Sequence, residues 1–421
     1  MLLKYRSRLI ALLVAIVTLT VAIVSFAPLP IKSIEVQPEV QLLGNPLLED
    51  GHQGHALNVW DLQSFDGKIY LAGGSTVSNS GPINVWAYSP NSQKFTKEYT
   101  VEEEAIEHYR VFDNQLYIPA ADPIEGDQTK FYRFEVNGQW QKYASAVVEL
   151  AHVRDLIKTR DKDILMVGNN RQPDRQSING TAIATTTEDS LVFQSAGVEN
   201  VESKGIVLVD YNWFFSIFKY QSQIFATNTL LRDADNYSGS TAVYDSESQQ
   251  FQLKFDLRND EFIPQNLITN SKYGIDLIYR LWNPIEFDNH LIYPVRSYSL
   301  SPQNYQQAYM NSIGFFDKSG MGSSPTEINL PQGALGEDVL LLNNELYVLA
   351  NKKKLGNQFS IYVFKTDRWE REIKWQQVVE FDSSNKARSF EYLDGTFYFG
   401  LGQDYGEAIA NSGAILSYSL P

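Results

Sequence analysis

A two-strand unit recurs along this 421-residue chain and constrains its fold more than any other feature. In each copy an apolar run leads into a tight polar turn, and a pair of large apolar residues follows the turn. The pairs are Ile69-Tyr70, Leu116-Tyr117, Ile164-Leu165, Ile224-Phe225, Ile292-Tyr293, Leu346-Tyr347 and Phe397-Tyr398. Turns such as Asp66-Gly67 and Asp394-Gly395 tolerate the positive φ of a two-residue hairpin. Each unit is therefore predicted to begin with a β-hairpin.

The units have the length of four-stranded sheets. Successive apolar pairs are 47, 48, 60, 68, 54 and 51 residues apart, which leaves room for a third and a fourth strand after most hairpins. In the third unit these strands are expected at residues 190–195 and 198–203. The last unit has room for only three strands, and segment 34–43 alternates like a strand outside any unit.

We therefore predict an all-β fold, a seven-bladed β-propeller of four-stranded antiparallel blades over residues 58–421. Segment 34–43 would supply the outer strand of the last blade, which leaves no free sheet edge at the closure. Pro38 within it suits an outermost strand, because one side of that strand has no hydrogen-bonded neighbour. A pair of β-sandwiches or a β-helix would not repeat a unit of this length seven times.

Residues 9–27 form an uncharged apolar stretch of 19 residues. At about 1.5 Å per residue, a helix of this length nearly spans a hydrocarbon core of roughly 30 Å. The basic residues Lys4, Arg6 and Arg8 precede it, so residues 1–8 are expected in the cytoplasm and the rest of the chain on the other side. No second stretch of this kind occurs, which predicts a single-pass membrane protein.

The same stretch has a second interpretation as a cleaved signal peptide ending at Ala27. A signal peptide has a shorter apolar region, and Pro28 directly after the cleavage point disfavours processing. We therefore predict an uncleaved signal anchor at 9–27, followed by a linker at 28–57. Both interpretations export the propeller to the extracytoplasmic side.

The first unit resembles the kelch repeat, in which an apolar run ends in Gly-Gly and two aromatic residues follow. Here the run ends at Gly73-Gly74, and Tyr88 and Phe95 follow. The fourth unit keeps the aromatic pair as Tyr244 and Phe251. Over residues 58–421 the chain is similar in architecture to the central propeller of the galactose-oxidase group. That resemblance implies a fold shared by binding scaffolds and a few enzymes.

Composition excludes several kinds of function. A formal net charge of −15 argues against nucleic acid as a partner, because such partners require a basic surface. The absence of cysteine excludes disulfides, thiolate metal sites and the cysteine-crosslinked tyrosine of galactose-oxidase chemistry. His52 and His55 lie in a Gly-rich loop, where exposed linker histidines are more common than metal ligands. We predict no metal and no cofactor.

Candidate ligand-binding residues lie near the start of the inner strands, which line the central channel of a propeller. These residues are Asp61, Arg110, Arg154, Asp155, Arg280, Asp338 and Arg388. The arginines are expected to converge on the channel mouth, where guanidinium groups bind carboxylates, sulfates or sugar acids. Alternatively, they pair with the neighbouring acidic residues. The nearby aromatic residues, which either stack on sugar rings or pack between blades, are Trp60, Trp213, Trp282 and Tyr298.

Function is less constrained than fold. The leading hypothesis is a non-catalytic scaffold that presents a propeller face to a protein or glycan partner outside a membrane. The alternative is a carbohydrate-active hydrolase or lyase that uses acidic residues and arginines at the channel mouth. A third hypothesis is an assembly factor for a membrane complex.

Overall fold

The computed structural model describes residues 40–420, with gaps at 77–79, 125–127, 146–149, 151, 160–162, 170–180, 187–190, 196–197, 200–213, 232–236, 254–261, 265–266, 268–276, 300–309, 357, 371 and 404–409. The predicted membrane segment 9–27 lies outside these residues. Within the described part of the chain, no helix is both long and apolar enough to span a bilayer.

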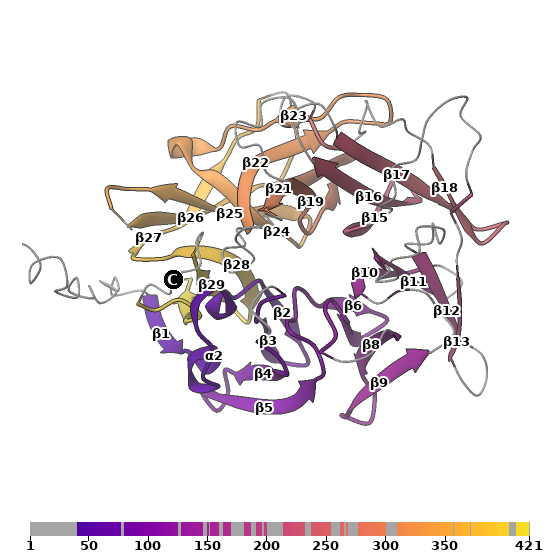
Figure 1. The fold of residues 1–421 in the computed structure, drawn as a ribbon. Helices are drawn as coiled ribbons and strands as arrows, with labels where there is room; N and C mark the ends of the chain where they lie inside the picture. Colours follow the sequence, from indigo (N-terminus) through magenta and orange to yellow (C-terminus); the bar gives the residue numbers. More distant parts are fainter. Residues whose placement is uncertain are drawn as a thin grey trace, which may run out of the picture. The chain divides into compact units, whose positions relative to one another are not determined.

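The described residues form seven four-stranded antiparallel blades that follow one another around a ring, which confirms the predicted propeller (Figure 1). Blades 1 to 3 consist of β2 (Asp61–Phe65), β3 (Lys68–Ala72), β4 (Ile83–Ser89) and β5 (Lys94–Val101), then β6 (Arg110–Phe112), β7 (Gln115–Pro119), β8 (Thr129–Phe134) and β9 (Trp140–Ser145), then β10 (His152–Lys158), β11 (Ile164–Asn169), β12 (Thr181–Thr186) and β13 (Leu191–Ser195).

Blades 4 and 5 share one continuous sheet. Their strands are β15 (Ser216–Tyr220), β16 (Gln223–Leu231), β17 (Tyr237–Asp245) and β18 (Gln250–Leu253), then β20 (Ile285–Phe287), β21 (His290–Ser299), β22 (Met310–Lys318) and β23 (Thr326–Glu327). The strand β19 (Leu277–Leu281) pairs with both β16 and β21 and so joins the two blades. A short strand, β14 (Val198–Glu199), runs parallel to β18 at the outer edge of blade 4.

Blades 6 and 7 complete the ring. Their strands are β24 (Leu335–Leu342), β25 (Glu345–Lys353), β26 (Phe359–Thr366) and β27 (Gln376–Ser383), then β28 (Lys386–Leu393), β29 (Thr396–Gly402), β30 (Ile415–Ser419) and β1 (Val40–Gly44). β1 is antiparallel to β30, with Val40 opposite Tyr418. The closing strand thus lies at 40–44, and residues 34–39 of the expected segment are outside the described part. The described residues also include the short helices α2 (Pro46–Glu49), η1 (Gly54–Leu57) and η3 (Pro331–Gly333).

The third blade differs from the sequence prediction. Residues 190–195 were expected as its third strand, but Leu191–Ser195 is its fourth strand, β13. The third strand is β12, a Thr- and Ala-rich segment in which Ile183 is the single large apolar residue. Its weak hydrophobic pattern explains why the prediction missed it. Val198, expected in the fourth strand of this blade, instead belongs to β14 of blade 4.

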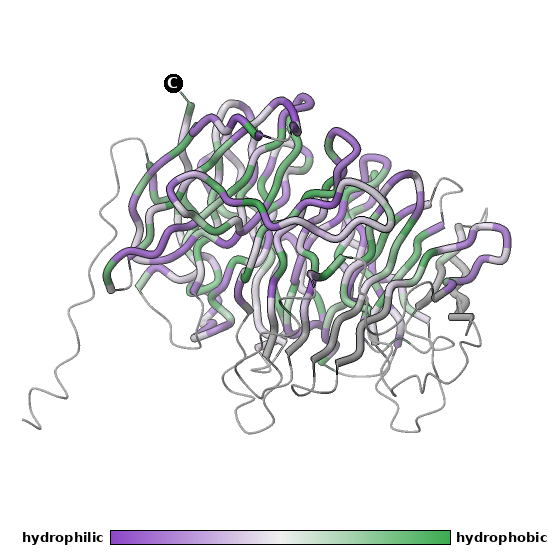
Figure 2. The backbone as a smooth tube through the Cα atoms, turned by 90° about the horizontal axis from the view of Figure 1, so that it is seen from above, coloured by the Kyte–Doolittle hydropathy of each residue, from purple (hydrophilic) through white to green (hydrophobic). Residues whose placement is uncertain are grey.

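The core lies between the blades. Among the described residues, seven clusters of buried apolar side chains each combine residues from two consecutive blades, including the pair formed by blades 7 and 1, and the cluster of blades 1 and 2 also contains Trp282, which precedes blade 5. Each blade is therefore covered on both faces, and strands such as β25 read as nearly continuous apolar runs. Figure 2 shows hydrophobic stretches along the strands and hydrophilic stretches at the turns.

Closure of the ring by β1 predicts that the same substitution at two neighbouring residues of β1 has different effects on stability. Val40 is 4% exposed and packs among apolar residues of blades 6 and 7, whereas its neighbour Gln41 is exposed. Val40→Asp places an unpaired carboxylate in that core and is expected to lower the free energy of unfolding by several kcal/mol. Gln41→Asp is expected to change it by less than about 0.5 kcal/mol. Denaturant unfolding of the two variants measures the difference, and equal stabilities would contradict the closure.

Candidate ligand cavity in the central channel

When the seven units are aligned on their hairpin turns, the same position carries a polar residue in every blade. It lies within the inner strand or just before it. We call these seven residues the polar girdle: Asp61, His108, Asp155, Ser216, Asn283, Asp338 and Ser389. The next position is apolar in every blade. In three inner strands, β10, β24 and β28, a β-bulge directly precedes the girdle residue and directs its side chain.

The three girdle aspartates each accept a hydrogen bond from the backbone of the following blade. The pairs are Tyr109 N to Asp61 Oδ2 (2.9 Å), Ile217 N to Asp155 Oδ2 (3.2 Å) and Phe390 N to Asp338 Oδ2 (3.4 Å). Asp155 and Asp338 also accept the N–H of the residue that follows them in their own strand. These carboxyl groups therefore hold neighbouring inner strands in register.

The other four girdle residues also bond to the following blade or to the strand that leads into it. The pairs are His108 Nε2 to Arg154 O (2.9 Å), Ser216 Oγ to Leu281 O (2.8 Å), Asn283 Nδ2 to Asp338 Oδ1 (3.1 Å) and Ser389 Oγ to Val59 O (3.0 Å). The last of these joins blade 7 to blade 1. The girdle is consequently a closed circuit of hydrogen bonds around the channel.

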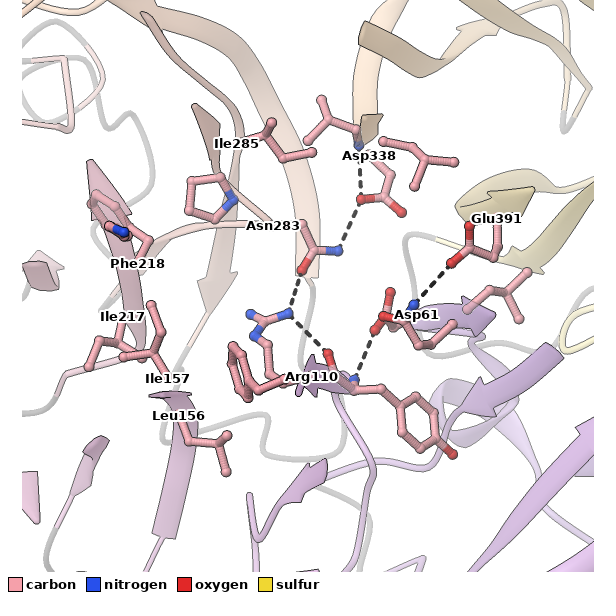
Figure 3. Close-up of a pocket in the computed structure, with 18 of the residues that line it drawn as sticks. Asp61, Arg110, Leu156, Ile157, Ile217, Phe218, Asn283, Ile285, Asp338 and Glu391 are labelled. Carbon is pink, nitrogen blue, oxygen red and sulfur yellow. Dashed lines mark hydrogen bonds between the residues drawn. The ribbon is translucent and has the colours of Figure 1, made fainter. Parts of the chain in front are cut away.

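A cavity of about 330 Å³ lies within the channel and is lined by residues from the inner strands of all seven blades (Figure 3). Its polar lining includes the carboxyl groups of Asp61, Asp338 and Glu391 and the side-chain amides of Gln63 and Asn283. Its apolar lining includes the aromatic residues Tyr109, Phe112, Phe218 and Phe390, of which Tyr109, Phe218 and Phe390 also belong to the buried clusters between blades. The cavity therefore combines hydrogen-bonding groups with apolar and aromatic residues.

Arg110 crosses the channel beside this cavity. Its Nε and Nη2 donate to the two carboxylate oxygens of Asp155 at 2.9 and 3.1 Å, a bidentate pair. Its Nη1 donates to Asn283 Oδ1 at 3.0 Å, and Asn283 in turn donates to Asp338 (Figure 3). A continuous chain of hydrogen bonds thus runs from blade 3 through blades 2 and 5 to blade 6. These hydrogen bonds leave few N–H groups of Arg110 free to bind a ligand.

The carboxyl groups that line the cavity differ in pKa from that of Asp155, which holds Arg110. Burial disfavours ionisation of Asp155, but Arg110 and His108 outweigh it and hold the pKa well below its usual range. Burial, with the nearby Asp61 carboxyl, raises the pKa of Asp338 to about 8. Burial also raises the pKa of Asp61, and it raises the pKa of Glu391 to about 7. Near neutral pH the cavity therefore holds carboxyl groups that can still give or take a proton.

The other three predicted arginines do not line the cavity. Arg154 and Arg280 share Glu107, with N–O distances of 3.5 and 2.8 Å, and Arg388 lies 3.5 Å from Glu337. Arg280 and Arg388 are buried and stack on the rings of Trp282 and Trp60, at 5.4 and 4.8 Å. Asp61, Arg110 and Asp338 are thus brought together at the cavity, with Asp155 holding Arg110, whereas the remaining arginines pair with Glu107 or Glu337 outside the cavity lining.

Sequence reasoning missed part of this arrangement. The girdle members His108, Ser216, Asn283 and Ser389 were not predicted, although an alignment of the seven units on their hairpin turns places a polar residue there each time. Trp60 and Trp282 pack within buried clusters, and Trp213 and the side chain of Tyr298 lie outside the described residues. In the described segments, no group of three or more His, Asp or Glu side chains is arranged to hold a metal ion.

Comparison with known proteins gives structural neighbours alone. No family model and no curated protein matches the sequence. An ulvan lyase of a polysaccharide lyase family is 10% identical, covers 90% of this chain and 95% of its own, and has a TM-score of 0.49. A second polysaccharide lyase is 10% identical over 88% and 91%, with a TM-score of 0.46. The β-propeller domain of the Trilobed protease from Pyrococcus furiosus is 10% identical over 81% and 90%, with a TM-score of 0.41.

The raised pKa of Asp338 predicts a pH-dependent stability. Folded protein keeps this proton up to about pH 8, whereas an unfolded aspartate releases it near pH 4. The native state therefore binds more protons between these values, and stability falls as the pH rises through that window. Asp338→Asn removes this loss, so the stability of the variant relative to wild type should increase between pH 5 and pH 9 by a few kcal/mol, to order of magnitude.

Urea unfolding at a series of pH values measures this increase. Asp382→Asn is the matched control, because Asp382 is half exposed on β27 and pairs with Lys354, which lowers its pKa. The control should not gain stability with rising pH. Parallel stability curves for Asp338→Asn and wild type would contradict the assignment.

Proposed function

We propose that this protein is a glycan-binding protein held on the outer side of a membrane, and that a sugar residue occupies the channel cavity. The observation that supports this most strongly is the lining of the cavity, in which residues with carboxyl and amide side chains occur together with aromatic residues. Sugar hydroxyls pair with carboxyl and amide groups, and the apolar face of a sugar ring stacks on aromatic side chains. A volume of about 330 Å³ suits one or two sugar rings.

The charges of the lining favour a neutral or amino sugar over a sugar acid. The fork of Arg110 is already engaged by Asp155 and Asn283, which leaves Lys219 as the remaining cation of the lining. Three carboxyl groups, those of Asp61, Asp338 and Glu391, face the same space. A ligand carboxylate would be repelled by whichever of these groups is ionised, whereas hydroxyl and ammonium groups would be bound.

The scattered positions of the exposed apolar residues favour a glycan over a protein as the partner. Among the described residues, the most exposed large apolar side chains include Leu48, Val136 and Leu355, which belong to α2, blade 2 and blade 6. Protein-binding surfaces usually gather such residues into one patch. The channel cavity is the feature that collects residues from every blade.

A second candidate function is acid–base catalysis on the same glycan, by a hydrolase or a lyase. The Asp61 and Asp338 carboxyl groups interact, and the pKa of each is raised, so that one can be protonated while the other is ionised. Pairs of carboxyl groups in different protonation states serve as acid and base in glycoside cleavage. Release of product from a bound glycan separates this function from binding alone.

The anchor and the kelch-type ancestry belong to the same proposal. The uncharged stretch at 9–27 and the basic residues before it support a signal anchor. The rings of Tyr88 and Phe95 pack against each other across β4 and β5 with centroids 4.9 Å apart, and those of Tyr244 and Phe251 do so across β17 and β18 at 5.4 Å. A shared cross-strand role in two blades supports descent from a kelch-like repeat.

Binding of the full chain in detergent to a panel of neutral, amino and acidic oligosaccharides tests this function. The membranes are first washed with carbonate to test the predicted anchor. Release of the protein in this wash would contradict the anchor. We expect neutral or amino sugars to bind by calorimetry, and Gln63→Leu to weaken that binding about tenfold, as expected for the loss of one hydrogen-bonding side chain.

The matched control is Gln141→Leu, the same substitution at an exposed position of β9. It should leave the affinity unchanged. If no sugar binds, if sugar acids bind best, or if Gln63→Leu binds as well as the control, the proposal fails.

A further inference from the structure

The channel is filled by side chains at the end where the inner strands start. The residue directly before the girdle is at most 5% exposed in six of the seven blades. Large side chains that meet at one level of a narrow axis leave little space between them, because protein interiors are closely packed. We call these six residues the channel plug: Trp60, Glu107, Phe215, Trp282, Glu337 and Arg388.

Contacts across the ring show that the plug occupies the channel itself. Trp282 precedes blade 5, but it belongs to the same buried cluster as Trp60 and apolar residues of blades 1 and 2. Its ring centre lies 5.4 Å from that of the girdle residue His108 in blade 2. Arg280 Nη1 donates to Glu107 Oε2 at 2.8 Å, which links β19 to the segment before blade 2. Because blades 2 and 5 are not neighbours in the ring, these contacts cross its axis.

The cavity reaches solvent at the opposite end, beside the hairpin turns. The third residue after the girdle is exposed in four blades, at Val111, Lys219, Glu286 and Leu341. Lys219 also lines the cavity, as does Phe112, the fourth residue after the girdle in blade 2. Among the described residues, no member of the channel plug lines it. The cavity therefore extends from the girdle toward the hairpin turns and away from the plug.

We infer that the cavity is a blind pocket entered from the hairpin-turn face, and that it binds the end of a glycan chain rather than an internal segment. An internal segment must leave its site in two directions, whereas a blind pocket has one exit. A volume of about 330 Å³ holds one or two sugar rings, so the next sugars of the chain lie at the mouth beside Lys219. The identity of the ligand rests on the proposed function, but the direction of entry does not.

Thiol labelling tests the direction of entry, since the chain has no cysteine of its own. Phe218 lines the cavity and Phe215 belongs to the plug, and they are 4% and 5% exposed on either side of the girdle in blade 4. We expect Phe218→Cys to react with methyl methanethiosulfonate at least about tenfold faster than its matched control Phe215→Cys, because a thiol in the plug reacts only when the structure opens locally. Charge alone predicts the opposite order, since Arg154 and Arg280 lie over the ring of Phe215 and would favour a thiolate there.

Binding stoichiometry of the unmodified full chain tests recognition of glycan ends. The probes are a neutral pair, maltohexaose and amylose, and an amino-sugar pair, the glucosamine hexamer and chitosan. High ionic strength suppresses non-specific attraction of chitosan to the acidic protein. By calorimetry, we expect one protein per glycan molecule for hexamer and polymer alike.

Several proteins along each polymer molecule would overturn the inference, as would labelling of Phe215→Cys as fast as Phe218→Cys. If a cysteine variant does not fold, the stoichiometry of the unmodified chain decides. If neither pair of glycans binds while the labelling rates differ as expected, the glycan proposal fails and the blind pocket is still supported.

Discussion

The polar girdle is the interaction on which the rest of this structure depends. Apolar packing between blades supplies much of the driving force, but it is non-directional and would tolerate small slips of one blade against the next. The girdle adds directional hydrogen bonds at one level of the channel, from each blade to its neighbour. Because these bonds are buried, a slipped register would leave polar groups unpaired, and the native register is favoured accordingly.

The same constraint creates the chemistry of the channel. Seven polar side chains must converge on a narrow axis, and three of them are aspartates. Asp155 has Arg110 as a bidentate partner and stays ionised, whereas burial raises the pKa of both Asp61 and Asp338, and the nearby Asp61 carboxyl adds to the shift of Asp338. A structural device that aligns blades thereby leaves proton-binding carboxyl groups facing the cavity. This link explains why the proposed site lies where the girdle is least compensated in charge.

The sequence predicted the architecture because local rules dominate it. A hairpin turn needs residues that tolerate positive φ, and residues such as Asp113, Asn114, Asp288 and Asn289 have it. The third blade was misassigned because β12 carries little hydrophobic signal. The candidate arginines near the inner strands were identified, but their long side chains reach different partners, and sequence spacing does not show which.

A double-mutant cycle between Arg110 and Asp155 tests the central role of the girdle most directly. Unfolding free energies of Arg110→Met, Asp155→Asn and the double variant give the coupling of the two side chains, with the exposed pair Lys354 and Asp382 as the reference cycle. We predict a coupling of about 2 kcal/mol or more between Arg110 and the girdle residue Asp155, and less than about 1 kcal/mol for the exposed pair. Additive effects within about 0.5 kcal/mol at the girdle would contradict this account.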